Sequence, residues 1–133
     1  MNDPSIDSSA QRRAGAAVAT LAAIAVMAIV LRTQGRVWWC ACGEWNLWSG
    51  DVWSSHNSQH LFDPYSFTHV LHGVIFAGVL RWLRPGWTTS LKVVVSTVVE
   101  CLWEIVENSR FVIDRYREAT ISLDYYGDSI VNS

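Results

Sequence analysis

Residues 14–31 read AGAAVATLAAIAVMAIVL, eighteen residues without a charged side chain. An α-helix of this length, with a rise of about 1.5 Å per residue, spans about 27 Å, close to the hydrocarbon thickness of a bilayer. The arginines that precede it also suit a signal peptide, but the apolar run exceeds the usual length and lacks a small-residue cleavage site. The stretch therefore predicts a retained transmembrane helix.

Two later stretches extend this apolar pattern. Ser66 to Leu80 is apolar apart from its histidines, and Leu91 to Ile113 is rich in Val, Ile, Leu and Trp. Only 17% of the 133 residues are charged, so we expect one all-α membrane domain over residues 13–133, preceded by a polar disordered tail over 1–12. We expect an integral membrane bundle of three transmembrane helices, with bounds of about 13–31, 66–83 and 90–110.

A long loop rich in tryptophan follows the first expected helix. Tryptophan prefers the membrane–water interface, so this loop is expected to lie there, with a short interfacial helix over Asp51–Gln59. The basic residues divide evenly between the two sides, which leaves the orientation open, and the absence of a basic patch argues against nucleic acid as a partner. The tryptophans of the loop are Trp38, Trp39, Trp45, Trp48 and Trp53.

Ionisable residues interrupt the second and third apolar stretches. His69 and His72 are spaced i, i+3, and Glu100, Glu104 and Glu107 are spaced i, i+4, i+7, so each set shares one helix face. A charged group in hydrocarbon is costly and is normally kept for a function or a tight pairing. For antiparallel helices we expect Glu107 near His69 and Glu104 near His72, with Glu100 about 10 Å deeper than Glu107.

Imidazoles and carboxylates on facing helices can bind a divalent metal ion, and the expected ligands are His69, His72, Glu104 and Glu107. Such an ion activates water or polarises a phosphoryl or carbonyl group. This predicts a metal-dependent hydrolase or transferase acting on a lipid or a lipid-linked phosphate. The expected catalytic residues are Asp128 and Glu100. Further candidates on the same side, for substrate or headgroup binding, are Arg115, Arg117, His56, His60 and Asp63, with Asp114 and Asp124 nearby.

Other interpretations of these residues remain open. The histidines and glutamates can instead hydrogen-bond to each other and fix the helix pairing, or bind a heme or pigment of a partner. The chain would then be a non-catalytic accessory subunit of a larger respiratory or photosynthetic complex. A small transporter is a third option, although three helices are few for a solute path. Arg115 and Arg117 also suit interfacial anchors, and His56 and His60 suit either solvated residues or extra ligands.

The three cysteines give little information in the sequence. Cys40 and Cys42 form a C-x-C, across which a disulfide would be strained. Zinc sites normally need a second ligand pair at a defined spacing, so the C-x-C by itself is interpreted as incidental. Cys101 is expected to pack as a small apolar residue.

Three motifs resemble a bacterial inner-membrane family of unknown function: SHNSQHLFDPYSFTHVLHG over 55–73, the glutamate-rich segment WEIVEN over 103–108, and YYGDSIVNS over 125–133. The similarity runs from about Gly35 to the last residue. It implies a small multi-pass protein of the inner membrane, with a fourth hydrophobic helix expected beyond Ser133. The pattern is also distantly similar to VanZ-like membrane proteins.

Overall fold

The computed structural model describes residues 4–119 and 127–133, and within these ranges the chain is helical and forms no sheet. One isolated β-bridge pairs Trp48 with Phe62 inside the long loop. The all-α prediction is therefore confirmed. The helices are α1 (Pro4–Thr33), α2 (Ser66–Leu83), α3 (Thr89–Glu107) and α4 (Arg110–Ala119).

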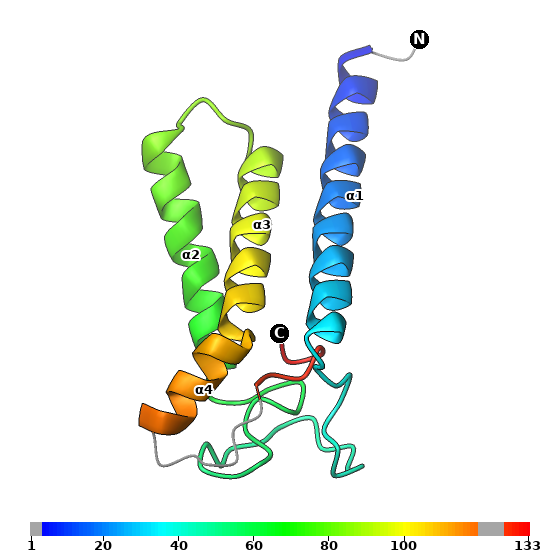
Figure 1. Cartoon of the computed structure of the whole chain (residues 1–133). Helices are drawn as coiled ribbons and strands as arrows, with labels where there is room; N and C mark the ends of the chain where they lie inside the picture. The colour runs from blue at the N-terminus through cyan, green and yellow to red at the C-terminus, as the bar shows by residue number, and fades with distance from the viewer. Residues whose placement is uncertain (1–3, 120–126) are drawn as a thin grey trace.

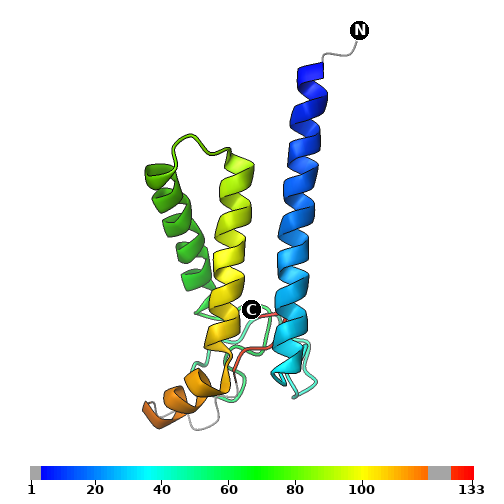
Figure 2. The ribbon, with the colours of Figure 1, turned by 45° about the horizontal axis from the view of Figure 1, so that its top comes forward.

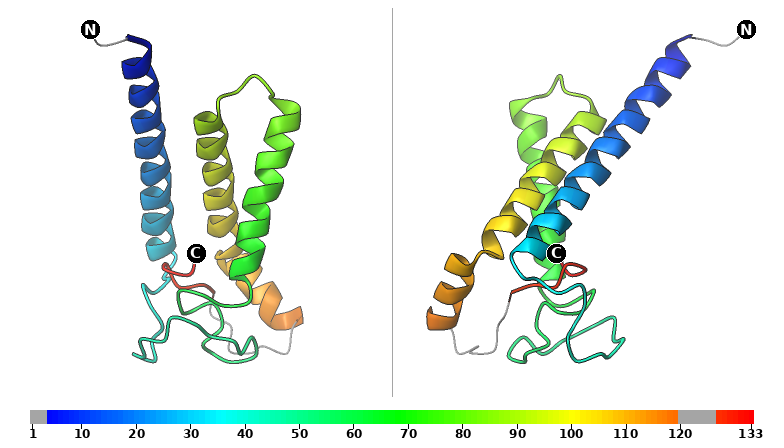
Figure 3. Two further views of the ribbon diagram at one scale, coloured as in Figure 1. Left: turned by 180° about the vertical axis from the view of Figure 1, so that it is seen from behind. Right: turned by 45° about the vertical axis from the view of Figure 1, so that its right-hand side comes forward.

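The three long helices stand side by side, with α3 in the middle. α2 and α3 form an antiparallel hairpin, and α1 runs along the other side of α3 (Figure 1). The long loop of residues 34–65 and the C-terminal segment 127–133 gather at the same end of the helices, opposite the N-terminus (Figure 2). α4 turns away from α3 at that end (Figure 3). The long loop and the C-terminal segment therefore lie together at one end of the helices, where they can shape a site.

Two of the helices are long and apolar enough to cross a membrane, namely residues Ser9–Thr33 of α1 and the whole of α2. α2 has no buried residue, and large apolar side chains such as Phe67 and Val70 are exposed along it. α3 is of similar length but carries Lys92 and three glutamates. Length and composition alone thus single out α1 and α2.

The first helix is longer than expected. It begins at Pro4 and includes residues 4–12, for which the composition predicted a disordered tail. Proline suits the first position of a helix, where its missing N–H would have had no partner. Ala10, Gln11 and Arg12 then have good helix propensity, so the helix extends beyond the apolar stretch that predicted it.

The third helix ends earlier than expected, at Glu107 rather than near residue 110. Asn108 caps it, because its backbone N–H and its Nδ2 both donate to the carbonyl oxygen of Glu104, at 3.0 and 3.1 Å. Ser109 lies directly before α4 and caps its start, where its Oγ accepts a hydrogen bond from the N–H of Val112 at 3.5 Å. Asn and Ser favour such ends because their side chains compete for backbone hydrogen bonds. The apolar pattern did not predict α4.

The expected interfacial helix over Asp51–Gln59 is wrong, because this segment forms successive turns. The N–H groups of Ser54 and Asn57 each donate to the carbonyl three residues earlier, at 3.3 and 3.1 Å. Ser58 then has a φ of 56°, in the left-handed region that ends such a series.

The C-terminal segment 127–133 holds the long loop against the helices. The N–H of Ser129 donates to the carbonyl of Ser58 at 2.7 Å, and that of Ile130 to the carbonyl of Val37 at 2.8 Å. Ile130 packs in a small core whose other buried members are Met27, Leu31 and Cys101. The last residues thus connect α1, α3 and the loop.

Candidate functional site

Two histidines of α2 and two glutamates of α3 meet at the end where the loop gathers. Nδ1 of His69 lies 3.1 Å from Oε1 of Glu100 and 3.1 Å from Oε1 of Glu104. Nδ1 of His72 lies 3.3 Å from the same oxygen of Glu100. Glu104 is almost fully buried, with 1% of its side chain exposed. We call these four residues the His/Glu cluster.

The pairing within this cluster differs from the expected one by about one helical turn. The expected neighbours were Glu107 for His69 and Glu104 for His72, with Glu100 deeper than both. The structure places Glu104 and Glu100 beside His69, and Glu100 beside His72. Glu100, expected as a catalytic residue, is therefore positioned as a candidate ligand.

The short turn between α2 and α3 explains this register. His72 lies eleven residues before Leu83, the end of α2, and Glu100 lies eleven residues after Thr89, the start of α3. In an antiparallel helical hairpin, residues equally distant from the turn lie at the same height. The pairing thus follows from counting outward from the turn at Pro85-Gly86.

The donor set of the cluster suits a divalent cation. One imidazole nitrogen can donate only one proton, so His69 Nδ1 cannot satisfy both carboxylates. In the described part of the chain, Glu100 Oε2 and Glu104 Oε1 are buried and make no hydrogen bond. Ligand atoms around a metal such as zinc lie about 3.3–3.8 Å apart, close to the separations seen here. His69, His72 and Glu100 offer ligand atoms that all lie within 4.8 Å of one another.

A buried amide extends the cluster to the C-terminal segment. Nδ2 of Asn108 donates to Oδ2 of Asp128 at 3.0 Å and to Oε2 of Glu104 at 3.4 Å, and its Oδ1 accepts from the N–H of Asp128 at 2.7 Å. Asn108 has no exposed surface. It holds two buried carboxylates at once, so it positions Asp128 beside the cluster. Sequence reasoning missed this role, although Asn108 follows the glutamate stripe directly.

Two cavities flank the His/Glu cluster, and His69 lines both. The first, of about 280 Å³, is also lined by His72, Glu107 and Asp128. The second, of about 460 Å³, is lined by both glutamates of the cluster and by apolar side chains such as Met27 of α1 and Phe76 of α2. These volumes are near the lower end of small-ligand sites. Glu107 thus faces the same cavity as Asp128, one turn beyond the cluster.

Tyr65 and Tyr116 also line the first cavity. Their hydroxyl oxygens lie 3.5 Å apart, which joins the start of α2 to α4. The hydrogen bond with Tyr116, together with burial, raises the pKa of Tyr65 to about 12. Tyr65 therefore stays protonated at neutral pH and can donate a hydrogen bond to a bound anion.

The predicted headgroup arginines lie apart from the cluster. Arg117 lines a separate cavity of about 390 Å³ together with Arg36, Arg110 and Asp114. The guanidinium of Arg115 stacks on the ring of Phe111, with its carbon 5.2 Å from the ring centre. Neither arginine lines the two cavities beside the His/Glu cluster.

The remaining candidates have other neighbours. Asp63 is fully buried and accepts hydrogen bonds from the N–H groups of Ser66 at 2.9 Å and Ser58 at 3.1 Å, so it holds the turn that leads into α2. His56 and His60 lie beside the two loop cysteines rather than beside His69. Asp124 lies outside the described residues.

The chain matches the family described as "Protein of unknown function (DUF2585)" over residues 31–133. A match over this share of the chain shows that the chain belongs to this family. The expected membership of a bacterial family of unknown function is confirmed. All the candidate site residues lie within the matched segment.

Three curated relatives illustrate this similarity. A UPF0314 protein of Rhizobium meliloti (strain 1021) is 50% identical over 92% of this chain and 63% of the relative. UPF0314 proteins of Sphingopyxis alaskensis and Paracoccus denitrificans are 46% and 45% identical, over 84% and 92% of this chain and 60% and 63% of the relatives. The chain thus spans less than two thirds of the length of these relatives. No solved structure matches the chain.

Proposed function

We propose that this chain is a multi-pass protein of the bacterial inner membrane that binds a divalent metal ion at the His/Glu cluster. We further propose that it uses this ion to hydrolyse or transfer a phosphate group on a lipid or lipid-linked substrate. The observation that carries the proposal is the approach of two carboxylates, Glu100 and Glu104, to one imidazole nitrogen of His69. A divalent cation offsets both charges and uses the oxygens that hydrogen bonding leaves unsatisfied.

The position of α3 supports a membrane location for the cluster. α3 packs between α1 and α2, so its glutamates are directed toward protein rather than toward lipid. This allows α3 to serve as the third span despite its charges. Exposed tryptophans occur at both ends of the helices, with Trp45 and Trp53 in the loop and Trp82 near the opposite turn. Such a distribution is typical of interfacial belts.

The residues then take distinct roles. His69, His72, Glu100 and Glu104 supply the ligands. The bound ion would lower the pKa of a coordinated water and polarise a phosphoryl oxygen. Asp128 lines the adjoining cavity of about 280 Å³, held there by Asn108, where its carboxylate can orient a water molecule or accept its proton.

The neighbouring groups suit a phosphorylated headgroup. Tyr65 lines the same cavity, and a phenol hydroxyl can donate to a phosphate oxygen. Arg115 and Arg117 lie on α4, at the end of the helices where a headgroup would lie, and arginine binds phosphate bidentately.

Manganese binding in mild detergent tests the metal site. Mn²⁺ prefers carboxylate and imidazole to thiolate, so it reports on this cluster rather than on cysteines. We expect saturable binding by electron paramagnetic resonance, lost in Glu100→Gln and His72→Ala and kept in Glu118→Gln, an exposed carboxylate on α4. Equal binding in Glu100→Gln and in the unmodified protein would refute the site.

Release of phosphate from phosphatidic acid and from a polyprenyl phosphate, in the same micelles, tests the reaction class. We expect release that depends on Mn²⁺ and falls at least about a hundredfold in Asp128→Asn. Saturable metal binding without any release would leave the metal site in place and overturn the phosphate chemistry.

A second candidate function is an accessory subunit of a larger membrane complex. The exposed tryptophans of the loop, together with the uncovered face of α2, favour it because such surfaces suit a protein partner. In that case the His/Glu cluster fixes the pairing of α2 and α3. Co-migration with a large complex, without bound metal, would favour this function over the first.

A further inference from the structure

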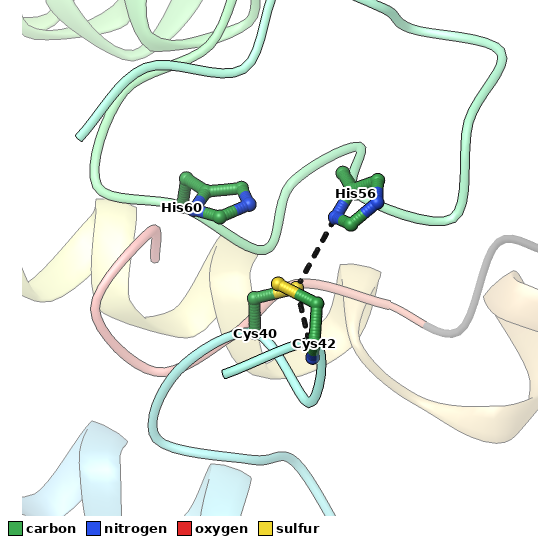
Figure 4. Close-up of side chains that lie close together, drawn as sticks. All are labelled: Cys40, Cys42, His56 and His60. Carbon is green, nitrogen blue, oxygen red and sulfur yellow. Dashed lines mark hydrogen bonds between the residues drawn. The ribbon is translucent and has the colours of Figure 1, made fainter. Parts of the chain in front are cut away.

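The long loop brings together two pairs of metal-binding residues that are distant in the sequence. Cys40 and Cys42 form a C-x-C, and His56 and His60 form an H-x3-H. Their sulfur atoms and imidazole rings gather between two passes of the loop (Figure 4). Each of the four offers one ligand atom, and these atoms all lie within 4.8 Å of one another. We call these residues the Cys/His cluster.

We propose that the Cys/His cluster is a structural metal site that binds Zn²⁺ through two thiolates and two imidazoles. This site is separate from the His/Glu cluster and does not depend on the function proposed for it. Two cysteines and two histidines are a common ligand set of structural zinc sites, and the spacing of the histidines falls within the usual range. The C-x-C is one residue tighter than usual, but the histidines supply the second pair that a zinc site requires.

The separations within the cluster fit one tetrahedral ion. Nδ1 of His56 lies 3.4 Å from Sγ of Cys40. In a tetrahedral zinc site, with Zn–S near 2.3 Å and Zn–N near 2.0–2.1 Å, a sulfur and a nitrogen lie about 3.6 Å apart. Cys42 is exposed and His56 half-buried, so small rotations of these two side chains would complete the geometry.

An unsatisfied buried nitrogen supports a metal-binding role for His60. Nδ1 of His60 is buried and has no hydrogen-bond partner in the described part of the chain, and His60 as a whole is only 2% exposed. A buried polar atom without a partner is costly in a protein that must fold in water or at an interface. Bonding to a cation would remove this cost.

The backbone around the cysteines has the form expected for thiolate ligands. The N–H of Cys42 donates to Sγ of Cys40, and the N–H of Glu44 donates to Sγ of Cys42, both at 3.4 Å. Gly43 between them has a φ of 76°, which lets the chain turn back and direct both N–H groups at sulfur. Hydrogen bonds of this kind orient and tune metal-bound sulfurs.

The metal site would organise the loop that borders the proposed active site. The carbonyl of His60 accepts from Nδ2 of Asn132 at 2.6 Å, and the carbonyl of Ser58 accepts from the N–H of Ser129 at 2.7 Å. Ser58 also lines the cavity of about 280 Å³. Zinc bound at His60 therefore fixes both the loop and the C-terminal segment that carries Asp128.

Cobalt substitution of the full-length protein in mild detergent, under a reductant that is not a thiol, tests this site without any mutation. Co²⁺ bound by thiolate gives a sulfur-to-cobalt charge-transfer band, and tetrahedral Co²⁺ gives strong visible absorption. We expect both the charge-transfer band and the visible absorption, and we expect added Zn²⁺ to remove them. The His/Glu cluster has no sulfur ligand, so it cannot produce the charge-transfer band. A protein that takes up cobalt without this band would overturn the Cys/His site and leave the other site standing.

Variants then assign the ligands. Cys42→Ser changes an exposed side chain, so we expect loss of the band with an unchanged helical circular dichroism spectrum. His60→Ala should also lose it. Cys101→Ala, a cysteine in α3 outside the cluster, and His72→Ala should both keep it. A band that persists in Cys42→Ser and disappears in Cys101→Ala would show that the sulfur ligand has been wrongly assigned.

Discussion

The two clusters contain all four histidines of the chain, two in each, but they are built differently. In the His/Glu cluster, helical spacing on α2 and α3 places the side chains, and carboxylates complete the set. In the Cys/His cluster, two turns of a loop place them, and thiols complete the set. The first set suits a hard, exchangeable cation beside a cavity, whereas the second suits tightly held zinc.

This difference suggests that the two clusters have different roles. Residues on rigid helices keep their positions with or without an ion, which is what the reaction proposed for the His/Glu cluster requires. The described residues of the loop have little regular structure of their own, so the loop depends on cross-links for its shape. We therefore expect metal removal to affect the loop far more than the helices.

The largest effect should follow removal of the proposed zinc ion by a strong chelator. We expect protease cleavage within residues 36–65 to accelerate at least about tenfold, because structural zinc supplies folding free energy directly. Cleavage within α2 and α3 should change little. Mass spectrometry of the fragments measures both rates, and Cys42→Ser should show fast cleavage even before chelation. Equal rates with and without chelator would remove the contrast between the two clusters.

Loss of the buried amide should have the next largest effect. Asn108→Ala leaves Asp128 and Glu104 without the donor that they share, so we expect a loss of about 3 kcal/mol in the free energy of unfolding. Asn46→Ala, at an exposed amide that donates to Glu44 in the loop, should cost less than about 0.5 kcal/mol. Unfolding by titration with a denaturing detergent gives both values. A similar cost for both variants would show that Asn108 does not hold the helix-based site together.

The sequence predicted the helix-based part of the molecule well. Spacings of three and four residues placed His69 with His72 and Glu100 with Glu104 on common faces, and these faces do meet. The exact pairing was wrong because the short turn at Pro85-Gly86 sets the register of the hairpin, so residues equally distant from this turn pair.

The Cys/His cluster in the long loop could not be predicted from the spacing of residues. No periodicity relates Cys40 to His60, and their approach depends on turns at Gly43 and Ser58, where positive φ angles redirect the chain. The role of Asn108 was equally hidden, because its partner Asp128 comes from a segment without regular structure. Tertiary contacts of irregular segments leave little local signal in a sequence.

A smaller effect should follow a substitution at the start of the C-terminal segment. Gly127 has a φ of 87°, and an added Cβ would meet the guanidinium of Arg36 and lie 2.7 Å from Cδ1 of Ile113. We expect Gly127→Ala to cost about 2 kcal/mol and to weaken metal binding at both clusters. Gly78→Ala, in open space on α2, is the matched control and should be neutral or slightly stabilising. A neutral Gly127→Ala would mean that the segment does not couple the clusters.

The smallest effect concerns the contact between the start of α2 and α4. Since the pKa of Tyr65 is raised to about 12, its neutral phenol contributes stability that is complete below about pH 10 and is lost as the pH rises through about 12. Phenolate absorbance should therefore show one late-titrating tyrosine, which disappears in Tyr65→Phe. A late-titrating tyrosine of the same size in Tyr65→Phe and in the unmodified protein would show that α4 packs independently of α2.

The zinc content of four matched proteins tests the central claim, that the His/Glu cluster binds a metal, most directly. After loading with Zn²⁺ and desalting, we expect about two ions per chain in the unmodified protein and about one in each of Cys42→Ser and His72→Ala. The variant that carries both Cys42→Ser and His72→Ala should retain no zinc. The same zinc content in His72→Ala as in the unmodified protein would contradict the account.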